Sequence, residues 1–466
     1  MKILVAGWDS GGGVEAVQTV VRRAVRRGHQ VRVLGTEGLR SRFESAGAGF
    51  SRYRYAPDND TRWRETDLLK EWEVRTPVGM FVRVRDRLMF GPARLFCRDI
   101  TEELDREPAD VVVVDTMIPS ALSGAEAAGV PAVLLMHGPY LLPRPGAPAI
   151  GTGFLPPHGP LGRLRDRTAA SLAMGVFRTG LPVLNQARAE LGLGPLRDLD
   201  DLVASASRVL VCTSPSYDFA PDAVPGNVRY VGPQLDDAGG GSWDQPWTGA
   251  DERPLVLVSL SSTVMSQEVL LQRAADALGQ LPVHALVTTG PAVDPETIRA
   301  PQNVSVRRWA RHADVLPGCS AVLTHGGHGT VVKALTAGVP LVIAPLGRDQ
   351  PDNAARVIRA GAGLRVRRTA DAATLGRAIA RVLDDHRYQD AARRMSQILA
   401  AERDDGLAVD ELERAAVGPR VSVSPPASAA EGSRGALGHG GGVRNGSGTL
   451  PPIGWATFRL GRQRRL

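Results

Sequence analysis

Lysine is almost missing from this chain. Only three of its 56 basic residues are lysine, and with 52 glycines and abundant alanine this bias reflects a GC-rich genome rather than recognition of a partner. The net charge of +7 is concentrated at one end, because seven arginines and one glutamate follow Ala415 and leave the body nearly neutral. A nearly neutral body with 5% aromatic residues and no clustered basic stripe excludes nucleic acid as the expected partner.

Cysteine and long apolar runs are scarce as well. The three cysteines, Cys97, Cys212 and Cys319, lie far apart without metal-ligand spacing, which predicts reduced thiols in a cytoplasmic protein. No apolar run reaches the roughly 18 residues that a membrane-spanning helix needs, so we expect no integral membrane segment. The first seven residues enter a strand-like run directly, and we expect no signal peptide there.

What is present is an alternation of short apolar runs and amphipathic stretches, which is typical of a parallel sheet flanked by helices. In the first half the expected strands are Ile3–Ala6, Val31–Leu34, Val111–Val114, Val133–Met136, Val209–Cys212 and Val228–Val231, and the expected helices include Val14–Arg27 and Ala121–Ala128. Helical, Arg-rich and Pro-rich sequence interrupts the alternation at Asp58–Leu104 and Tyr140–Leu193. We therefore predict a Rossmann-like N-terminal domain over residues 1–235 with two insertions.

A second alternation follows a Gly-, Asp- and Pro-rich linker at residues 236–253. Its expected strands are Leu255–Leu260, Val283–Thr288, Val304–Val306, Ala321–Thr324 and Leu341–Ala344. We predict a second Rossmann-like domain over residues 254–385, C-terminal helices over 386–416, and a disordered Gly- and Ser-rich tail over 417–466. The expected fold class is α/β, with two parallel-sheet domains facing a cleft, and ligands of such sheets bind beyond the carboxyl ends of the strands.

The most informative stretch lies between residues 323 and 350. It reads as an apolar strand, a glycine turn that holds His325, a helix, a second apolar strand, and the pair Asp349 and Gln350 at the start of another helix. Glycines let a ligand approach the backbone closely, and a helix N-terminus offers free N–H groups to a phosphate. The acid–amide pair is suited to hydroxyl groups, so the stretch predicts a site for a diphosphate that carries a sugar.

These motifs resemble those of the GT-B glycosyltransferases, and more narrowly those of the UDP/dTDP-glycosyltransferase family that modifies lipophilic natural products in actinobacteria. The resemblance covers residues 1 to about 416 and is strongest over Trp309–Gly363. There Trp-Ala-Arg-His, Leu-Pro-Gly-Cys, His-Gly-Gly-His-Gly-Thr, Ala-Gly-Val-Pro and Asp-Gln-Pro-Asp-Asn-Ala follow in the order and spacing of the family. A lone glycine cluster is weak evidence, whereas this ordered set is specific.

The resemblance implies a donor site whose members come from four turns of the second half. They are Ser261, Ser262, Trp309, His325, Gly327, Gly329, Thr330, Asp349 and Gln350. In such a site the tryptophan stacks on the nucleobase, the histidine and the backbone N–H groups beside it hold the diphosphate, the serines touch the phosphates, and the acid–amide pair holds the sugar. No Asp-X-Asp pair stands near the donor turn, so we expect no metal and no cofactor beyond a dTDP- or UDP-sugar co-substrate.

Two positions depart from the family pattern. Lys333 stands where many relatives have a glutamate that holds both ribose hydroxyls, and a lysine cannot accept hydrogen bonds. Because bacterial members that use dTDP-deoxysugars often lack that acid, Lys333 favours a dTDP-sugar over UDP-glucose. Gly13 stands where most relatives have the histidine that deprotonates the acceptor hydroxyl, and glycine transfers no proton.

Four other residues are candidates at that edge of the cleft. Asp115 follows a buried strand, matches the aspartate that orients the family's histidine, and is the first candidate for the proton acceptor, directly or through water. Its alternative role is to cap the helix expected to begin near Thr116. Asp9 and Glu15 are the reserve candidates. His137 follows a later strand and points to the same edge, where we expect it to line the acceptor.

The leading hypothesis is an inverting, metal-independent glycosyltransferase that moves a (deoxy)sugar from a dTDP- or UDP-sugar to a hydroxyl of a lipophilic, polyketide- or macrolide-like aglycone. The two insertions would shape the acceptor pocket. This chemistry needs an aligned acceptor and a neutralised leaving diphosphate. Two alternatives stay open. One is a non-catalytic helper of a partner glycosyltransferase, which Gly13 motivates. The other is a GT-B nucleotide-sugar epimerase, which needs several carboxylates around the sugar.

Overall fold

The N-terminal half is built on a parallel sheet of seven strands. In the computed structural model, which describes residues 1–418 except 75, 221–223, 236–242 and 248–251, the strand order is β3-β2-β1-β4-β5-β6-β7. The strands are β1 (Lys2–Ala6), β2 (Gln30–Gly35), β3 (Gly49–Arg52), β4 (Val111–Asp115), β5 (Ala132–Met136), β6 (Arg208–Val211) and β7 (Val228–Tyr230). Much of the predicted linker, and the predicted tail from residue 419 onward, lie outside the described residues.

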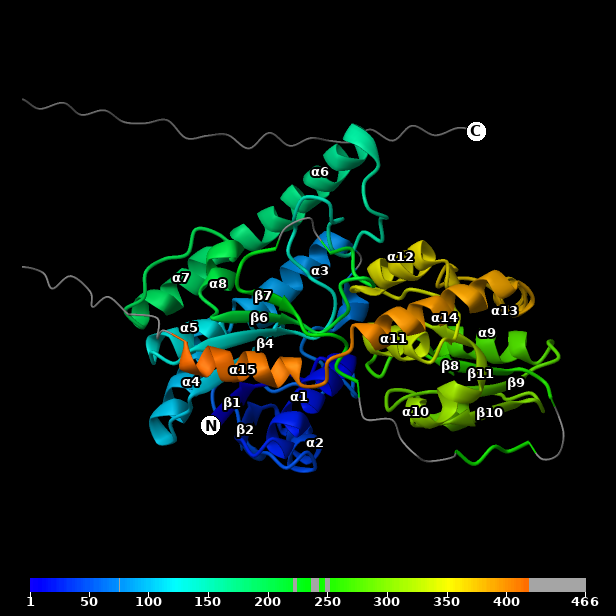
Figure 1. The fold of residues 1–466 in the computed structure, drawn as a ribbon, viewed down its shortest axis with the longest axis horizontal. Coiled ribbons are helices and arrows are strands. Elements are labelled where there is room, and N and C mark those ends of the chain that lie inside the picture. The colour runs from blue at the N-terminus through cyan, green and yellow to red at the C-terminus, as the bar shows by residue number, and fades with distance from the viewer. Residues whose placement is uncertain (75, 221–223, 236–242, 248–251, 419–466) are drawn as a thin grey trace, which may run out of the picture. The chain divides into compact units, whose positions relative to one another are not determined.

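Helices pack on both faces of this sheet (Figure 1). The helices of this half are α1 (Val14–Arg26), α2 (Arg40–Glu44), α3 (Pro77–Val84), α4 (Ala93–Arg106), α5 (Ala121–Ala127), α6 (Gly159–Arg178), α7 (Leu181–Glu190) and α8 (Leu199–Ala204). β4 and β5 are covered on both faces and are buried at every position. This coverage explains why each strand is formed by a largely apolar run. The first predicted insertion is shorter than expected, since α4 is a crossover helix whose Phe96 and Ile100 are buried against the sheet.

The C-terminal half repeats this architecture with six parallel strands in the order β10-β9-β8-β11-β12-β13. The strands are β8 (Leu255–Ser259), β9 (His284–Thr288), β10 (Val304–Arg307), β11 (Cys319–Thr324), β12 (Leu341–Ile343) and β13 (Gly363–Arg365). The helices are α9 (Glu268–Leu278), α10 (His312–Val315), α11 (His328–Thr336), α12 (Gln350–Ala360), α13 (Ala372–Asp384), α14 (His386–Ala401) and α15 (Leu407–Val417). Two parallel-sheet halves confirm the predicted fold class.

Two strands were not predicted, and both lie at an edge of their sheet. β3 reads Gly-Phe-Ser-Arg and β13 reads Gly-Leu-Arg, so neither contains an apolar run. Each pairs with a single neighbour, β3 with β2 and β13 with β12. An edge strand is less covered than a central one and does not need the continuous apolar sequence by which central strands are recognised.

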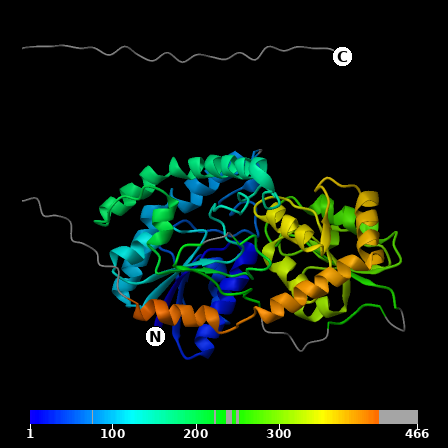
Figure 2. The same cartoon turned by 45° about the horizontal axis from the view of Figure 1, so that its top comes forward.

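The last described helix returns to the first half of the molecule. The chain leaves α14, which packs on the C-terminal half, and α15 then lies against α1 and the N-terminal sheet (Figures 1 and 2). Ala408, Val409 and Leu412 of α15 are buried in the same apolar cluster as Ile3 and Val5 of β1. The helices predicted together over residues 386–416 are therefore divided between the two halves.

The strand order places the candidate residues in one region. Asp9 follows β1, Asp115 ends β4 and His137 follows β5. All three therefore lie at the carboxyl edge of the N-terminal sheet. His325 and Asp349 follow β11 and β12 at the carboxyl edge of the other sheet. Carboxyl edges of parallel sheets are where loops leave room for ligands.

Candidate active site

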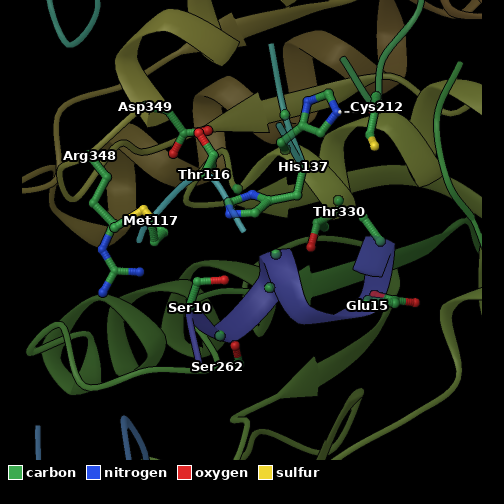
Figure 3. Close-up of a pocket in the computed structure, with 18 of the residues that line it drawn as sticks. Ser10, Glu15, Thr116, Met117, His137, Cys212, Ser262, Thr330, Arg348 and Asp349 are labelled. Atoms are coloured by element: carbon green, nitrogen blue, oxygen red, sulfur yellow. Dashed lines mark hydrogen bonds between the residues drawn. The ribbon is translucent and has the colours of Figure 1, made fainter. Parts of the chain in front are cut away.

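One large cavity, with a volume of about 1150 Å³, joins the two halves. Its walls come from the turn after β1 and the loops after β4 and β5 on one side, and from the turns after β8, β10, β11 and β12 on the other. All nine predicted donor-site residues line it, as do Asp9, Glu15 and His137. Figure 3 shows His137 near the centre of this space, with Asp349 and Thr330 from the C-terminal half and Ser10 and Glu15 from the N-terminal half around it.

The glycine turn after β11 leaves room for an imidazole and exposes a helix end. Gly326 has a φ of +96°, a left-handed conformation that only glycine adopts easily. A Cβ on Gly327 would lie 2.7 Å from His325 Nε2, so a side chain there would displace the ring. α11 begins at His328, and the backbone at Gly327, Gly329 and Thr330 faces the cavity. The first N–H groups of a helix have no partner within it, which suits an anion.

His325 is buried and neutral. Only 9% of the residue is exposed, and burial lowers its pKa to about 4, against the opposing charge of Asp349. A neutral imidazole donates one hydrogen bond and carries no positive charge. The neutral ring therefore adds no positive charge to this turn, where the N-terminus of α11 contributes the positive end of its dipole.

The two residues of the acid–amide pair have different surroundings. Asp349 is half-buried, precedes α12 and accepts a hydrogen bond from Asn353 Nδ2 at 2.8 Å. Gln350 is 2% exposed, and its Oε1 accepts hydrogen bonds from the backbone N–H groups of Leu346 and Gly347 at 2.7 and 2.9 Å. The carboxylate is therefore open to a ligand, whereas the amide oxygen already fixes the loop before it.

The remaining donor-site residues lie at the rim and floor of the cavity. Trp309 is 69% exposed although it lines the cavity, so its ring has a free face. Ser261 is buried, and its Oγ accepts a hydrogen bond from Thr263 N at 3.1 Å, which fixes the turn after β8. Ser262 lines the cavity beside it.

Two ion pairs link the halves across the cavity. Lys333, one helical turn beyond Gly329 on α11, pairs with Glu15 at the start of α1. Arg348 donates a hydrogen bond from its Nε to Glu71 Oε1 at 2.6 Å. Sequence reasoning missed Glu71, because it lies in the first predicted insertion with no motif around it. Lys333 and Arg348 are therefore already paired with carboxylates of the other half.

The turn after β1 holds a histidine that comes from another strand. Gly13 has an ordinary helical backbone, yet a Cβ there would lie 2.7 Å from His137 Nδ1 and 2.6 Å from Ser10 Oγ. His137 follows β5, and its Nε2 lies 3.6 Å from Asp115 Oδ1 at the end of β4. Burial acts to lower the pKa of His137, but the charges of the nearby carboxylates, Asp115 first and then Asp349, outweigh burial and raise it above the ordinary value.

The three carboxylates predicted as proton acceptors are placed differently from one another. Asp115 is 1% exposed and lies behind His137, and its Oδ1 accepts the backbone N–H of Met117 at 2.8 Å. Asp9 lines the cavity, and its Oδ1 accepts the backbone N–H of Gly11 at 3.1 Å, while burial raises its pKa. Glu15 is engaged by Lys333.

Away from these polar groups the cavity is apolar. Its lining comes largely from the two predicted insertions and from α8. The apolar residues are Met80, Phe81, Val84, Met89, Met117, Leu141, Leu142, Ile150, Ala173, Met174, Phe177, Leu199, Leu202 and Val203. Phe81 of α3 and Phe177 of α6 meet edge to face with ring centroids 5.9 Å apart. We call this part the apolar chamber.

Among the described residues, no three or more His, Cys, Asp or Glu side chains are grouped so that they could hold a metal ion. None of the helices that the structure describes is long and apolar enough to cross a membrane.

Comparison with known sequences identifies the family. Residues 272–413 match the family described as erythromycin biosynthesis protein CIII-like, C-terminal domain, and residues 10–174 match Glycosyltransferase Family 4. Over 418 residues the chain is 31% identical to 4'-demethylrebeccamycin synthase of Lentzea aerocolonigenes, covering 88% of this chain and 99% of the relative. The chain belongs to the GT-B natural-product glycosyltransferases.

Solved structures agree with the fold of this glycosyltransferase. The calicheamicin glycosyltransferase superposes with a TM-score of 0.68 at 24% identity, over 90% of this chain and 99% of the other. The glycosyltransferase VinC, solved in complex with dTDP, superposes with a TM-score of 0.65 at 19% identity, over 89% and 99% of the two chains. The comparisons favour the transferase over the epimerase and the non-catalytic helper that the sequence left open.

Proposed function

We propose that this glycosyltransferase moves a sugar, with inversion, from a dTDP-sugar to a hydroxyl group of a lipophilic natural-product aglycone. The observation that carries the proposal is a single cavity that is lined by the N-terminus of α11 from the second half and by the apolar chamber from the first half. A diphosphate suits the first environment and an apolar aglycone suits the second. Its volume of about 1150 Å³ is above the range of a pocket for one small ligand, as two co-substrates require.

On the donor side, the geometry supports the roles that the family resemblance implies. The free face of Trp309 would stack on the nucleobase. The backbone N–H groups at Gly327, Gly329 and Thr330 and the neutral imidazole of His325 would bind the diphosphate. Asp349 would accept hydrogen bonds from the sugar hydroxyls. Gln350 would act mainly by fixing the loop that carries Asp349, with Ser261 and Ser262 closing the turn beneath the phosphates.

The nucleotide preference rests on Lys333. It lies on the same face of α11 as Gly329 and one turn further along, where the ribose of a nucleotide would follow the diphosphate. Its ammonium group can only donate hydrogen bonds, and it is held by Glu15. A thymidine nucleotide lacks the 2′-hydroxyl and therefore needs no hydrogen-bond acceptor for that group at position 333, whereas a uridine nucleotide does.

A pair of variants tests this preference. Glu15→Gln/Lys333→Glu places a carboxylate at position 333 without a like charge beside it, and Glu15→Gln alone is the matched control. Hydrogen bonds to a charged group contribute about 1.5–3 kcal/mol, so the ratio of kcat/KM for the UDP-sugar to that for the dTDP-sugar should rise about tenfold or more in the double variant. An unchanged ratio would remove Lys333 from the account of nucleotide choice.

The transfer needs no resident metal in this proposal, because the leaving diphosphate is stabilised by the helix N-terminus and by His325. Activity should therefore persist in EDTA. Loss of activity in EDTA that Mg²⁺ restores would contradict this part. We also propose a cytoplasmic location, which the three free cysteines support.

The test of the proposed function is direct turnover. The purified chain is incubated with dTDP- and UDP-sugars and with panels of macrolide and aromatic polyketide acceptors. Mass spectrometry should show a glycosylated product together with the nucleoside diphosphate, and NMR should show the anomeric configuration inverted. Release of nucleoside diphosphate with a free, epimerised sugar, or no product with any acceptor, would overturn the proposal.

A further inference from the structure

The imidazole of His137 occupies the space that Gly13 leaves empty. A side chain at position 13 would start 2.7 Å from both Cε1 and Nδ1 of that ring, so position 13 and position 137 cannot both hold a large side chain in this arrangement. Gly13 has φ −68° and ψ −27°, which every amino acid adopts, so backbone strain does not explain the glycine. The glycine is explained by the atoms that its missing side chain would meet, which are this ring at 2.7 Å and Ser10 Oγ at 2.6 Å.

Asp115 lies beside one nitrogen of that ring. Its Oδ1 lies 3.6 Å from His137 Nε2, and the same oxygen accepts the backbone N–H of Met117. Catalytic hydrogen bonds are commonly long before the substrate binds. With Nε2–H directed at Asp115, a neutral ring carries its lone pair on Nδ1, the nitrogen that faces Gly13 and the cavity.

We propose that His137 is the general base of the transfer and that Asp115 is its positioning residue. The histidine–aspartate pair thus enters the cleft from the ends of β5 and β4, whereas the family pattern supplies the histidine from the turn after β1. The inference rests on the proposed transfer to an acceptor hydroxyl.

The step balances as a single displacement. The proton of the acceptor hydroxyl moves to His137 Nδ1 while the acceptor oxygen forms a bond to the anomeric carbon. The bond from that carbon to the β-phosphate oxygen breaks, and its electron pair leaves with the nucleoside diphosphate. Asp115 stabilises the imidazolium that forms, and the proton later passes to solvent.

The other carboxylates fit the role less well. Glu15 is engaged in an ion pair with Lys333, so its carboxylate is already committed to that contact. Asp115 is 1% exposed and is not part of the cavity wall, so it reaches the acceptor only through His137. Asp9 is the remaining rival, because it lines the cavity.

The first experiment removes the base. His137→Ala should lower kcat by about 10²- to 10⁴-fold, and the dissociation constant for dTDP should stay within about twofold of wild type. The loss should be smaller for a phenolic acceptor, whose pKa is about 10, than for an alcohol, because an acidic hydroxyl needs less help. Asp9→Asn is the rival variant. Full activity in His137→Ala with a large loss in Asp9→Asn would overturn the assignment.

A second experiment uses the clash itself. Gly13→Ala should lower kcat by about 10²-fold in wild type, because a displaced catalytic group costs that much. Its further effect in His137→Ala should be much smaller, because only Ser10 Oγ then remains in the way of the new Cβ. Gly12→Ala is the matched control, since a Cβ there meets no atom within 4 Å. Additive effects of Gly13→Ala and His137→Ala would contradict the proposal.

A third experiment moves the histidine back. In Gly13→His/His137→Ala the new side chain has the space of the old one, apart from the hydroxyl of Ser10, which can rotate away. This double variant should recover part of the activity that His137→Ala loses. No recovery, in a protein that melts as wild type and binds dTDP, would count against the idea that the two positions supply one base.

The positioning role of Asp115 has a separate readout. His137 must be neutral to accept a proton, so kcat/KM should fall as the pH falls through a pKa that the carboxylates of Asp115 and Asp349 raise above its ordinary value. His328, which also packs at this side of the cleft, has its pKa lowered to about 4 by burial and stays neutral there. Asp115→Asn should move the acid limb to lower pH, whereas a merely structural loss would leave it in place.

Failure of this inference is distinguishable from failure of the proposed function. If wild type forms no glycoside, the function falls. If wild type forms glycoside and His137→Ala forms it equally fast, only the assignment of the base falls.

Discussion

Each half of this glycosyltransferase holds a histidine over a glycine turn that follows a buried parallel strand. His325 stands over the turn after β11, and His137 stands over the turn after β1. A Cβ on Gly327 or on Gly13 would come within 2.7 Å of a ring nitrogen of its histidine. The two rings nevertheless differ in acid–base character, since the pKa of His325 is lowered to about 4 by burial and that of His137 is raised.

The difference comes from the neighbours and not from the turn. At His325 burial outweighs the charge of Asp349, and the neutral ring is suited to donate a hydrogen bond to an anion. At His137 the charges of Asp115, 3.6 Å away, and of Asp349 together outweigh burial and raise the pKa of the ring. At both turns a glycine leaves space for an imidazole. The balance between burial and the neighbouring carboxylates then sets whether that imidazole is suited to donating a hydrogen bond to an anion or to accepting a proton.

Among the variants on the donor side, the largest expected effect comes from removing His325. His325→Ala should lower kcat/KM by about 10²- to 10³-fold, because it deletes one donor to the charge that develops on the leaving diphosphate. Unlike His137→Ala, it should also weaken dTDP binding. Steady-state kinetics and calorimetry with dTDP measure the two effects. Equal dTDP affinity in the two variants would contradict the different roles assigned to His325 and His137.

A smaller effect is expected from the same methyl group added to each turn. Gly327→Ala should push His325 aside and raise KM for the donor by about tenfold or more, since each 1.4 kcal/mol of lost binding is a factor of ten. Gly13→Ala should lower kcat and leave donor KM unchanged. Circular dichroism confirms that both variants are folded. If both substitutions affected the same kinetic constant, the division of labour between the turns would be wrong.

Removal of the exposed ring should affect the donor side alone. Trp309→Ala should weaken dTDP binding by about tenfold, because stacking of a base on an aromatic ring contributes about 1–3 kcal/mol. Its thermal unfolding should match wild type, since the residue is 69% exposed. An unchanged dTDP affinity, measured by calorimetry, would exclude Trp309 from the nucleotide site.

The smallest effect is a difference between two titration curves. NMR of the ligand-free protein, with the nine histidines labelled in their rings, should show His325 protonated only near pH 4. The signals of His137 should titrate above the ordinary histidine pKa and should shift to lower pH in Asp115→Asn. The variants His137→Ala and His325→Ala assign the signals. Similar pKa values for the two rings would remove the contrast.

The donor side was the more predictable half of the site. His325, Gly327 and Asp349 lie within one stretch of sequence between two apolar strands, so their spacing predicted that they would share one edge of a sheet. The structure places them together on the cavity wall. Gln350 was predicted beside them, but the use of its amide oxygen by the backbone of Leu346 and Gly347 depends on loop geometry that no spacing reveals.

The acceptor side was less predictable because its neighbours are remote in sequence. Gly13 and His137 become neighbours only after β1 and β5 are placed in one sheet, and the pairs of Glu15 with Lys333 and of Glu71 with Arg348 join different halves. The sequence predicted Gly13 and His137 at one edge of the cleft, but it did not show that the glycine makes room for the histidine. The edge strands β3 and β13 were not predicted for a simpler reason, because neither contains an apolar run.

The return of α15 to the N-terminal sheet has a consequence for synthesis on the ribosome. Ala408, Val409 and Leu412 complete the apolar cluster around β1, yet they are translated after the whole of the second sheet. The first half, although it emerges first, cannot finish folding until the second half has been made. A chimera that exchanges the second half for that of another transferase has to cut the chain twice and keep residues 407–417 with the first half.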